Sequence, residues 1–177
     1  MRLVFSPEQI REATIRLASR INQDYNGHQI HLIGVLKGAF IFLADLVRHI
    51  TVPCSVDFVR LSSYGAGTET SGTVREVMPL VEPVTGRHVI VVEEIVDSGL
   101  TLARLLESLE RQGPASLRVC TLVDKTGRRR VRIPVHYRGF HVQDGFLLGY
   151  GLDLDERYRN LPGIYVMEEG DAPSRNP

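Results

Sequence analysis

The stretch that decides the fold is residues 89–101, which read VIVVEEIVDSGLT. Its first half is apolar and rich in β-branched residues, which is typical of a strand buried on both faces of a parallel sheet. Two adjacent carboxylates, Glu93 and Glu94, end the strand that we predict over residues 87–96. The run DSG at 97–99 breaks this strand, and a helix is predicted over residues 101–111.

The turn between this strand and this helix carries the chemistry. Small residues at the start of a helix let backbone N–H groups face a ligand, and with the helix dipole they favour a phosphate. Ser98 and Thr101 add hydroxyl donors, whereas Glu93 and Glu94 would repel an anion unless they bind a cation or sugar hydroxyls. The combination indicates a sugar phosphate with Mg²⁺. The alternative is a plain strand end followed by a helix that Asp97 caps.

The rest of the chain repeats this alternation of strand and helix. One helix is predicted from a capping box at 6–9 to the break at 26–27, and another after residues 37–38 through residue 50. Strands are predicted over 30–36, 52–61, 74–81 and 117–123, within 137–148, and over 163–167. Such alternation predicts an α/β fold with a mostly parallel sheet covered on both faces. Ligands of these sheets bind beyond the carboxyl ends of the strands.

Composition limits the classes of protein that the chain can represent. Its 177 residues fit one domain, which we place at residues 1–167 with a flexible tail at 168–177. Lys plus Arg equal Asp plus Glu at 21 each, and the zero net charge disfavours a nucleic-acid coat. Two cysteines form no disulfide scaffold, and no targeting or membrane-spanning segment is evident. We therefore expect a cytoplasmic protein without a membrane partner.

The run 89–101 resembles the phosphoribosyl diphosphate motif of the type I phosphoribosyltransferases. Four further segments resemble the hypoxanthine–guanine branch of that family and follow in the family's order, and the short chain resembles the bacterial members. They are VLKGAFIFLADL at 35–46, VDFVRLSSYGAGTETSG at 56–72, LVDKTGRR at 122–129 and FLLGYGLDLDERYRNLP at 146–162. The resemblance covers residues 35–162, most of the chain.

The resemblance implies the family's fold and reaction. The fold would be a mostly parallel central sheet flanked by helices, with a small hood subdomain. The reaction would transfer 5-phosphoribosyl from phosphoribosyl diphosphate to N9 of hypoxanthine, and of guanine, giving IMP or GMP and diphosphate in purine salvage. Mg²⁺ would be the cofactor, and the protein would form homodimers or homotetramers.

The resemblance also implies roles for the residues of the central motif. Asp97 would be the general acid or base near N7 of the purine. The 5′-phosphate would lie on Asp97, Ser98, Gly99, Leu100 and Thr101. Glu93 and Glu94 would face the ribose hydroxyls, directly or through Mg²⁺.

The outer segments would complete the site. Lys37, Gly38 and Arg159 would bind the diphosphate, and the Leu36–Lys37 peptide bond can be cis in this family. Ser63 and Tyr64 would belong to a lid that closes over the reacting centre. The purine would contact Ile95, Lys125, Phe146, Leu147 and Asp153. Among these, Lys125 would donate to the 6-oxo group, Phe146 would stack on the base, and Asp153 would bind a second metal ion.

Three positions depart from the family pattern. Residue 94 is glutamate where aspartate is common, which adds a methylene but still reaches a hydroxyl or a hydrated ion. Ala39 replaces a frequent serine and so removes a possible hydroxyl donor near the diphosphate. Gly151 stands where some members carry alanine, for which we expect a small loss of stiffness.

Two other interpretations compete with this one. The adenine-specific branch is disfavoured, because a lysine at 125 donates to a carbonyl oxygen and offers nothing to an exocyclic amine. The second alternative is a phosphoribosyltransferase-like regulator that binds RNA or DNA. It rests on the basic cluster Arg128, Arg129, Arg130 and Arg132, which we interpret instead as a solvated turn or a subunit contact, given the zero net charge.

Overall fold

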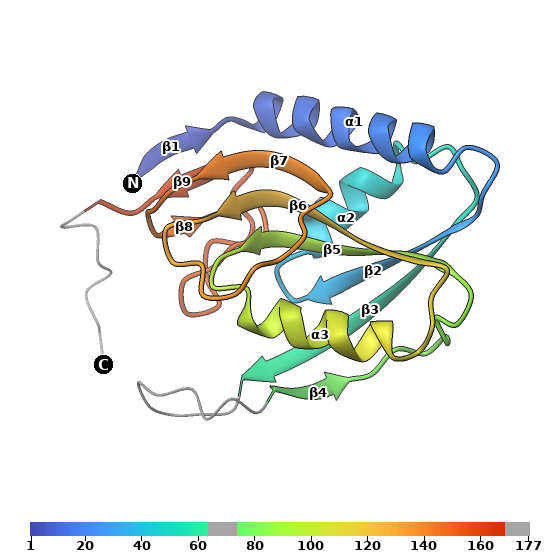
Figure 1. Cartoon of the computed structure of the whole chain (residues 1–177). Helices are drawn as coiled ribbons and strands as arrows, with labels where there is room; N and C mark the ends of the chain where they lie inside the picture. The colour runs from blue at the N-terminus through green and yellow to red at the C-terminus, as the bar shows by residue number, and fades with distance from the viewer. Residues whose placement is uncertain (64–73, 169–177) are drawn as a thin grey trace.

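The computed structural model describes residues 1–63 and 74–168 (Figure 1). Within these residues the strands form a six-stranded sheet in the order β4-β3-β2-β5-β6-β7 and a three-stranded sheet in the order β1-β9-β8. The strands of the large sheet are β2 (Ile30–Leu36), β3 (Cys54–Ser63), β4 (Val74–Met78), β5 (His88–Val96), β6 (Ser116–Lys125) and β7 (Tyr137–Val142). The predicted α/β fold class is confirmed.

Five neighbouring strands of the large sheet, β3, β2, β5, β6 and β7, run parallel, and β4 pairs antiparallel with β3 at one edge. β5 lies in the middle, between β2 and β6. Its residues Val89–Val92 are fully buried, as expected for a strand with both faces covered. The β5–β6 ladder ends at the pair Val96 and Asp124, so the DSG turn lies just past the carboxyl edge of the sheet.

Three helices cover the two faces of the large sheet in the described part of the chain. α1 (Pro7–Asp24) begins at the predicted capping box, in which Ser6 and Gln9 bond each other's backbone N–H. With α2 (Phe40–Val47) it covers one face, and α3 (Leu100–Glu110) covers the other (Figure 1). Each face carries its own apolar cluster, with Ile90 and Val92 in the first and Val89 and Val91 in the second.

The small sheet forms the predicted hood. It consists of β1 (Arg2–Phe5), β8 (Leu147–Leu148) and β9 (Ile164–Val166), all antiparallel. β1 has no counterpart in the sequence-based prediction, because four residues without alternation give little strand signal and its partner β9 lies 160 residues further along the chain. α2 ends at Val47 and not at residue 50 as predicted.

Two predicted features fall outside the described residues. Tyr64 of the lid is one, and the tail is the other apart from Glu168. No helix within residues 1–63 and 74–168 is long and apolar enough to cross a membrane.

Candidate active site

The turn that we predict to bind the 5′-phosphate lies between β5 and α3. Gly99 precedes the helix with a φ of 80°, and a Cβ at this position would come within 2.9 Å of the Ile133 side chain, so the turn requires glycine. The Ser98 hydroxyl accepts a hydrogen bond from the Leu100 N–H at 3.5 Å, and α3 has no acidic residue in its first turn. A cavity of about 480 Å³ opens here, lined by Asp97, Ser98, Leu100, Arg128 and Arg130. Its position matches the predicted 5′-phosphate site.

Asp97 and Lys125 meet at the carboxyl ends of β5 and β6. The Lys125 Nζ donates to Asp97 Oδ2 at 3.3 Å, and it lies 3.8 Å from Oδ1 of the exposed Asp144. The lysine side chain is only 6% exposed, whereas the Asp97 side chain is 37% exposed. Asp97 Oδ1 has no hydrogen-bond partner within the part of the chain that is described. The pair therefore presents one buried cation and one unsatisfied carboxylate oxygen next to the phosphate cavity.

Glu93 and Glu94 are neighbours near the end of β5, and each carboxyl group affects the pKa of the other. Burial, and then the neighbouring Glu94 carboxylate, raise the pKa of Glu93 well above its usual range. Burial also raises the pKa of Glu94, although the nearby Arg159 guanidinium opposes this. Glu94 Oε2 is buried and unpaired among the residues described. Such a pair is poised to bind hydroxyl groups or a cation.

The segment 36–38 begins at the last residue of β2 and contains a cis Leu36–Lys37 peptide bond, which the resemblance to the family allows. Gly38 lies against two other parts of the site. A Cβ there would overlap the Glu94 carboxylate, whose Oε1 would be 1.7 Å away. A Cβ at Gly151, where φ is 98°, would come within 2.2 Å of the Gly38 carbonyl oxygen. The backbone of 36–38 is thus packed between β5 and the loop that follows β8.

Arg159 forms ion pairs with other charged residues of that loop. Its guanidinium donates to the Gly151 carbonyl at 2.7 Å and contacts the Asp153 carboxylate at 2.8 Å and the Glu156 carboxylate at 3.1 Å. Glu156 also accepts from Lys37 Nζ at 2.8 Å. The two predicted diphosphate-binding cations, Lys37 and Arg159, therefore share one carboxylate partner.

The remaining residues that we predict for the purine site differ in their exposure. Leu147 is buried in β8, and Ile95 is half-buried against the α1–α2 core. Phe146 is 47% exposed, so its ring has an open face for stacking. Ser63 ends β3, while its predicted lid neighbour Tyr64 is outside the described residues.

The carboxylates of the site fit Mg²⁺ only if the substrate shares the ion. Among the described side chains no group of three His, Cys, Asp or Glu residues could hold a metal alone. Mg²⁺ is usually bound by one or two carboxylates together with substrate oxygens and water. The unpaired Glu94 oxygen beside Glu93, and separately Asp153, suit such a shared site.

Comparison with known proteins agrees with this geometry. The family description "Phosphoribosyl transferase domain" matches residues 6–155. The chain belongs to the phosphoribosyltransferase family. It is 42% identical to the hypoxanthine-guanine phosphoribosyltransferase of Dictyostelium discoideum over 94% of this chain and 95% of the relative. It is 43% identical to the hypoxanthine phosphoribosyltransferase of Escherichia coli over 91% of this chain and 92% of the relative.

Solved structures of phosphoribosyltransferases share the whole fold. A hypoxanthine-guanine phosphoribosyltransferase from Bacillus anthracis superposes with a TM-score of 0.90 at 45% identity, covering 95% of this chain and 99% of that one. A hypoxanthine phosphoribosyltransferase from Staphylococcus aureus gives a TM-score of 0.92 at 35% identity, covering 96% and 92%. The resemblance inferred from the sequence is thereby confirmed.

The structure explains two departures from the phosphoribosyltransferase pattern. Ala39 lies at the start of α2, where no side-chain hydrogen bond caps the helix, in line with the expected loss of a hydroxyl donor. Gly151 does more than reduce stiffness, which corrects our expectation. Its positive φ and its contact with the Gly38 carbonyl leave no room for an alanine methyl without a backbone shift.

Sequence reasoning missed two residues of the site. Arg129 is not solvated as we expected, because its side chain is only 17% exposed and its guanidinium binds the ends of β5 and β6. Glu156 was also missed. Its spacing of three from both Asp153 and Arg159 was the available signal, but the spacing alone does not show that Lys37 reaches it.

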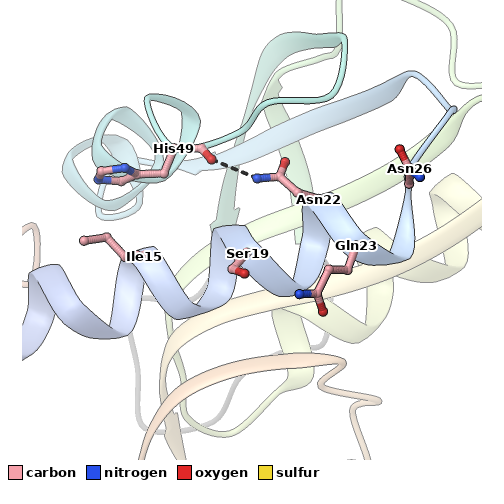
Figure 2. A pocket seen from close by; sticks show the side chains of 6 residues that line it. All are labelled: Ile15, Ser19, Asn22, Gln23, Asn26 and His49. Atoms are coloured by element: carbon pink, nitrogen blue, oxygen red, sulfur yellow. Dashed lines mark hydrogen bonds between the residues drawn. The ribbon is translucent and has the colours of Figure 1, made fainter.

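A second groove lies away from this site, between α1 and the end of α2 (Figure 2). It measures about 490 Å³ and is lined by Ile15, Ser19, Asn22, Gln23, Asn26 and His49. Asn22 crosses it: its Nδ2 donates to the His49 carbonyl at 3.0 Å, and its Oδ1 accepts from the Thr51 N–H at 2.8 Å. These two hydrogen bonds connect α1 to the segment after α2, which gives Asn22 a structural role in the groove.

Proposed function

We propose that the protein transfers the phosphoribosyl group of phosphoribosyl diphosphate to N9 of a 6-oxopurine in purine salvage. Hypoxanthine would be the preferred base and guanine the second. The observation that carries this proposal is the Asp97–Lys125 pair beside the phosphate cavity at the carboxyl ends of β5 and β6. The enzymes from D. discoideum and E. coli, to which the chain is over 40% identical, carry this activity in their names.

Lys125 and Asp97 would recognise the two sides of the purine. An ammonium group donates hydrogen bonds and accepts none, so Lys125 suits the 6-oxo oxygen. Asp97 would exchange a proton with N7, using the oxygen that has no other partner in the described structure. Phe146 would stack on one face of the base, and the backbone of Leu147 would contact its edge.

The ribose phosphate would lie across the end of β5. The N–H groups of residues 98–101 would hold the 5′-phosphate, with the Ser98 and Thr101 hydroxyls. Glu93 and Glu94 would accept from the ribose hydroxyls, and the developing positive charge on the ribose favours nearby carboxylates. Glu93, Glu94 and Asp153 would hold Mg²⁺, which neutralises diphosphate charge when bound.

The diphosphate would lie on Lys37, Gly38 and Arg159. In the structure both cations contact Glu156, so an incoming diphosphate would replace that carboxylate as their partner. Placement and charge would provide most of the catalysis, since the reaction needs no covalent intermediate with the protein. A cytoplasmic location, a homodimer or homotetramer, and a single domain at 1–167 are part of the same proposal.

The regulator that binds RNA or DNA is the weaker alternative. Its support was the basic cluster at 128–132, but the Arg129 guanidinium is turned inward onto β5 and β6. The names of the relatives from D. discoideum and E. coli describe enzymes.

The test is to incubate the purified protein with phosphoribosyl diphosphate, Mg²⁺ and each of hypoxanthine, guanine, xanthine, adenine and uracil. Formation of IMP, with GMP as the second product, is the expected result. Folded protein that binds phosphoribosyl diphosphate and forms no nucleotide with any base would overturn the proposal. Omission of Mg²⁺ should abolish turnover, and an unchanged rate in excess chelator would contradict the shared metal site.

A further inference from the structure

The β5–β6 ladder stops one residue before the groups that the proposed function needs. Its last pair is Val96 and Asp124, whereas the functional pair is Asp97 and Lys125. Beyond the ladder, backbone hydrogen bonds between these two strands no longer fix how Asp97 lies relative to Lys125. Another group must hold the two strand ends together.

Arg129 provides that link. Its Nε donates to the Asp97 carbonyl at 2.8 Å, and its Nη2 donates to the Val96 carbonyl at 2.9 Å and the Lys125 carbonyl at 3.1 Å. The same Nη2 contacts Asp124 Oδ1 at 2.5 Å. One guanidinium thus binds the last ladder pair and the functional pair on both strands, which the planar fork of arginine allows and the point charge of lysine does not.

A buried carboxylate fixes the guanidinium in place. The Asp124 side chain is 6% exposed and contacts Arg129 through one oxygen and Arg138 through the other, at 3.2 Å. Arg138 is 53% exposed, so Arg129 is the more buried partner. A buried carboxylate with two guanidinium partners constrains both rotation and displacement of the Arg129 side chain.

The turn itself does not depend on the Arg129 side chain. The backbone N–H groups of Arg129 and Arg130 bind the Thr126 and Ser98 carbonyls at 3.1 and 3.0 Å. These bonds remain when the side chain is changed, so the local fold has a second support. The side chain therefore has a role separable from folding.

We propose that Arg129 is a positioning residue, which acts on the reaction through Asp97 and Lys125 by holding the ends of β5 and β6 in register. The inference rests on the proposed function, because it assigns a purpose to the Asp97–Lys125 geometry. It also makes a structural claim about Lys125 that can be measured without turnover.

The main variant is Arg129→Lys. It keeps a positive charge opposite Asp124 but loses the planar guanidinium that reaches several acceptors at once. We expect kcat to fall roughly 10²-fold, since a displacement near 1 Å of reacting groups has that effect. The KM for hypoxanthine should rise about tenfold through the weakened Lys125 contact. Arg132→Lys is the matched control: Arg132 belongs to the same basic run and is exposed, and its kinetics should stay at wild-type values.

A double-mutant cycle separates positioning from general damage. Lys125→Met should raise the KM for hypoxanthine by itself. In that background Arg129→Lys should change this KM by less than about twofold, because Lys125, through which Arg129 acts on purine binding, is gone. Independent, multiplying effects of the two substitutions would overturn the proposal.

The lysine content of the chain allows a readout without catalysis. The sequence has two lysines, Lys37 and Lys125, so ¹³C-lysine labelling gives two ε-carbon signals in an NMR spectrum, and Lys125→Met assigns them. Arg129→Lys adds a third lysine signal, which the double variant Lys125→Met/Arg129→Lys distinguishes from that of Lys125. In Arg129→Lys the Lys125 signal should move and the Lys37 signal should stay. An unmoved Lys125 signal together with wild-type kinetics would refute the proposal.

Two further points keep the test decisive. If Arg129→Lys does not fold, the double variant Asp124→Asn/Arg129→Gln removes both buried charges together and takes its place in every measurement. If the wild type proves to lack transferase activity, the proposed function fails. The ¹³C-lysine spectrum still shows whether Arg129 positions Lys125.

Discussion

At the residue scale, Asp97 combines two properties that its neighbours lack. One carboxylate oxygen accepts from Lys125, and the other has no partner within the described residues, although it is shielded from solvent. A buried acceptor without a hydrogen bond costs about 1–3 kcal/mol. A protein keeps an unpaired buried oxygen of this kind most readily where the oxygen binds a substrate.

Asp97→Asn tests this role. Asparagine preserves size and still accepts from Lys125 through its carbonyl oxygen, but it cannot exchange a proton. We expect kcat to fall by roughly 10²–10⁴ with the fold intact. Asp144→Asn removes an exposed carboxylate on the other side of Lys125 and serves as control. Turnover close to wild type in Asp97→Asn would rule out acid–base catalysis by this residue.

Glu93 makes stability depend on pH. Its pKa is raised in the folded protein, mainly by burial, so the unfolded chain gives up this proton at a lower pH than the folded chain does. Stability is therefore lost as the pH rises from the unfolded value of about 4.3 through the raised folded value. Glu93→Gln abolishes that loss.

We expect Glu93→Gln to raise the melting temperature by a few degrees at pH 8 and by much less near pH 4. Thermal denaturation across this range measures the difference, with Glu110→Gln on the exposed side of α3 as control. The variant should also bind phosphoribosyl diphosphate more weakly. The charged carboxylate that lowers the stability of the folded protein is the group that we propose for substrate binding. A larger gain at pH 4 than at pH 8 would contradict the sign.

At the element scale, α1 is joined to the segment after α2 by one side chain. Asn22 makes both bonds across the groove of Figure 2, to the His49 carbonyl and the Thr51 N–H. These contacts lie far from the carboxyl ends of the strands. Their loss should change stability and leave the chemistry unchanged.

Asn22→Ala should lower stability by about 1 kcal/mol, because two hydrogen bonds are lost and the better helix propensity of alanine offsets part of that. The melting temperature should fall by roughly 2–4 °C with kcat unchanged. Asn26→Ala is the matched control, since Asn26 lines the same groove and its exposed side chain makes no hydrogen bond to the described residues. Equal effects of both variants would show that the bridge contributes nothing.

At the scale of the whole molecule, the site lies where the hood meets the large sheet. Lys37 comes from the end of β2, and Glu156 and Arg159 come from the loop between β8 and β9. Contacts between these distant segments link Lys37, Glu156 and Arg159 in a chain of ion pairs. A diphosphate has to compete with the Glu156 carboxylate for both cations.

Glu156→Gln should therefore lower the KM for phosphoribosyl diphosphate. An exposed ion pair is worth about 0–1 kcal/mol, so the change should be about two- to fivefold and should shrink at high salt. Initial-rate kinetics at low and high ionic strength measure it. Asp155→Asn alters the charge of the next residue without touching Lys37 or Arg159, and an equal effect there would attribute the change to net charge alone.

Local pattern was enough to predict much of this protein. The buried run at 89–96, the capping box at Ser6 and the alternation of strand and helix each depend on residues close together in the chain, so periodicity and turn chemistry reveal them. The motif at 93–101 pointed to a phosphate and a sugar for the same reason. The family resemblance then indicated the outer segments of the site.

Contacts between distant residues were decided only by the folded chain. β1 is a strand because β9 pairs with it, Gly151 must be glycine because Gly38 lies against it, and the Arg129 side chain is half-buried because β5 and β6 present carbonyls to it. β9, Gly38 and the β5 carbonyls are all distant in sequence from the residues that they contact. A short strand, a glycine or an arginine in a basic run looks the same without these partners. Packing in three dimensions gives such residues their roles.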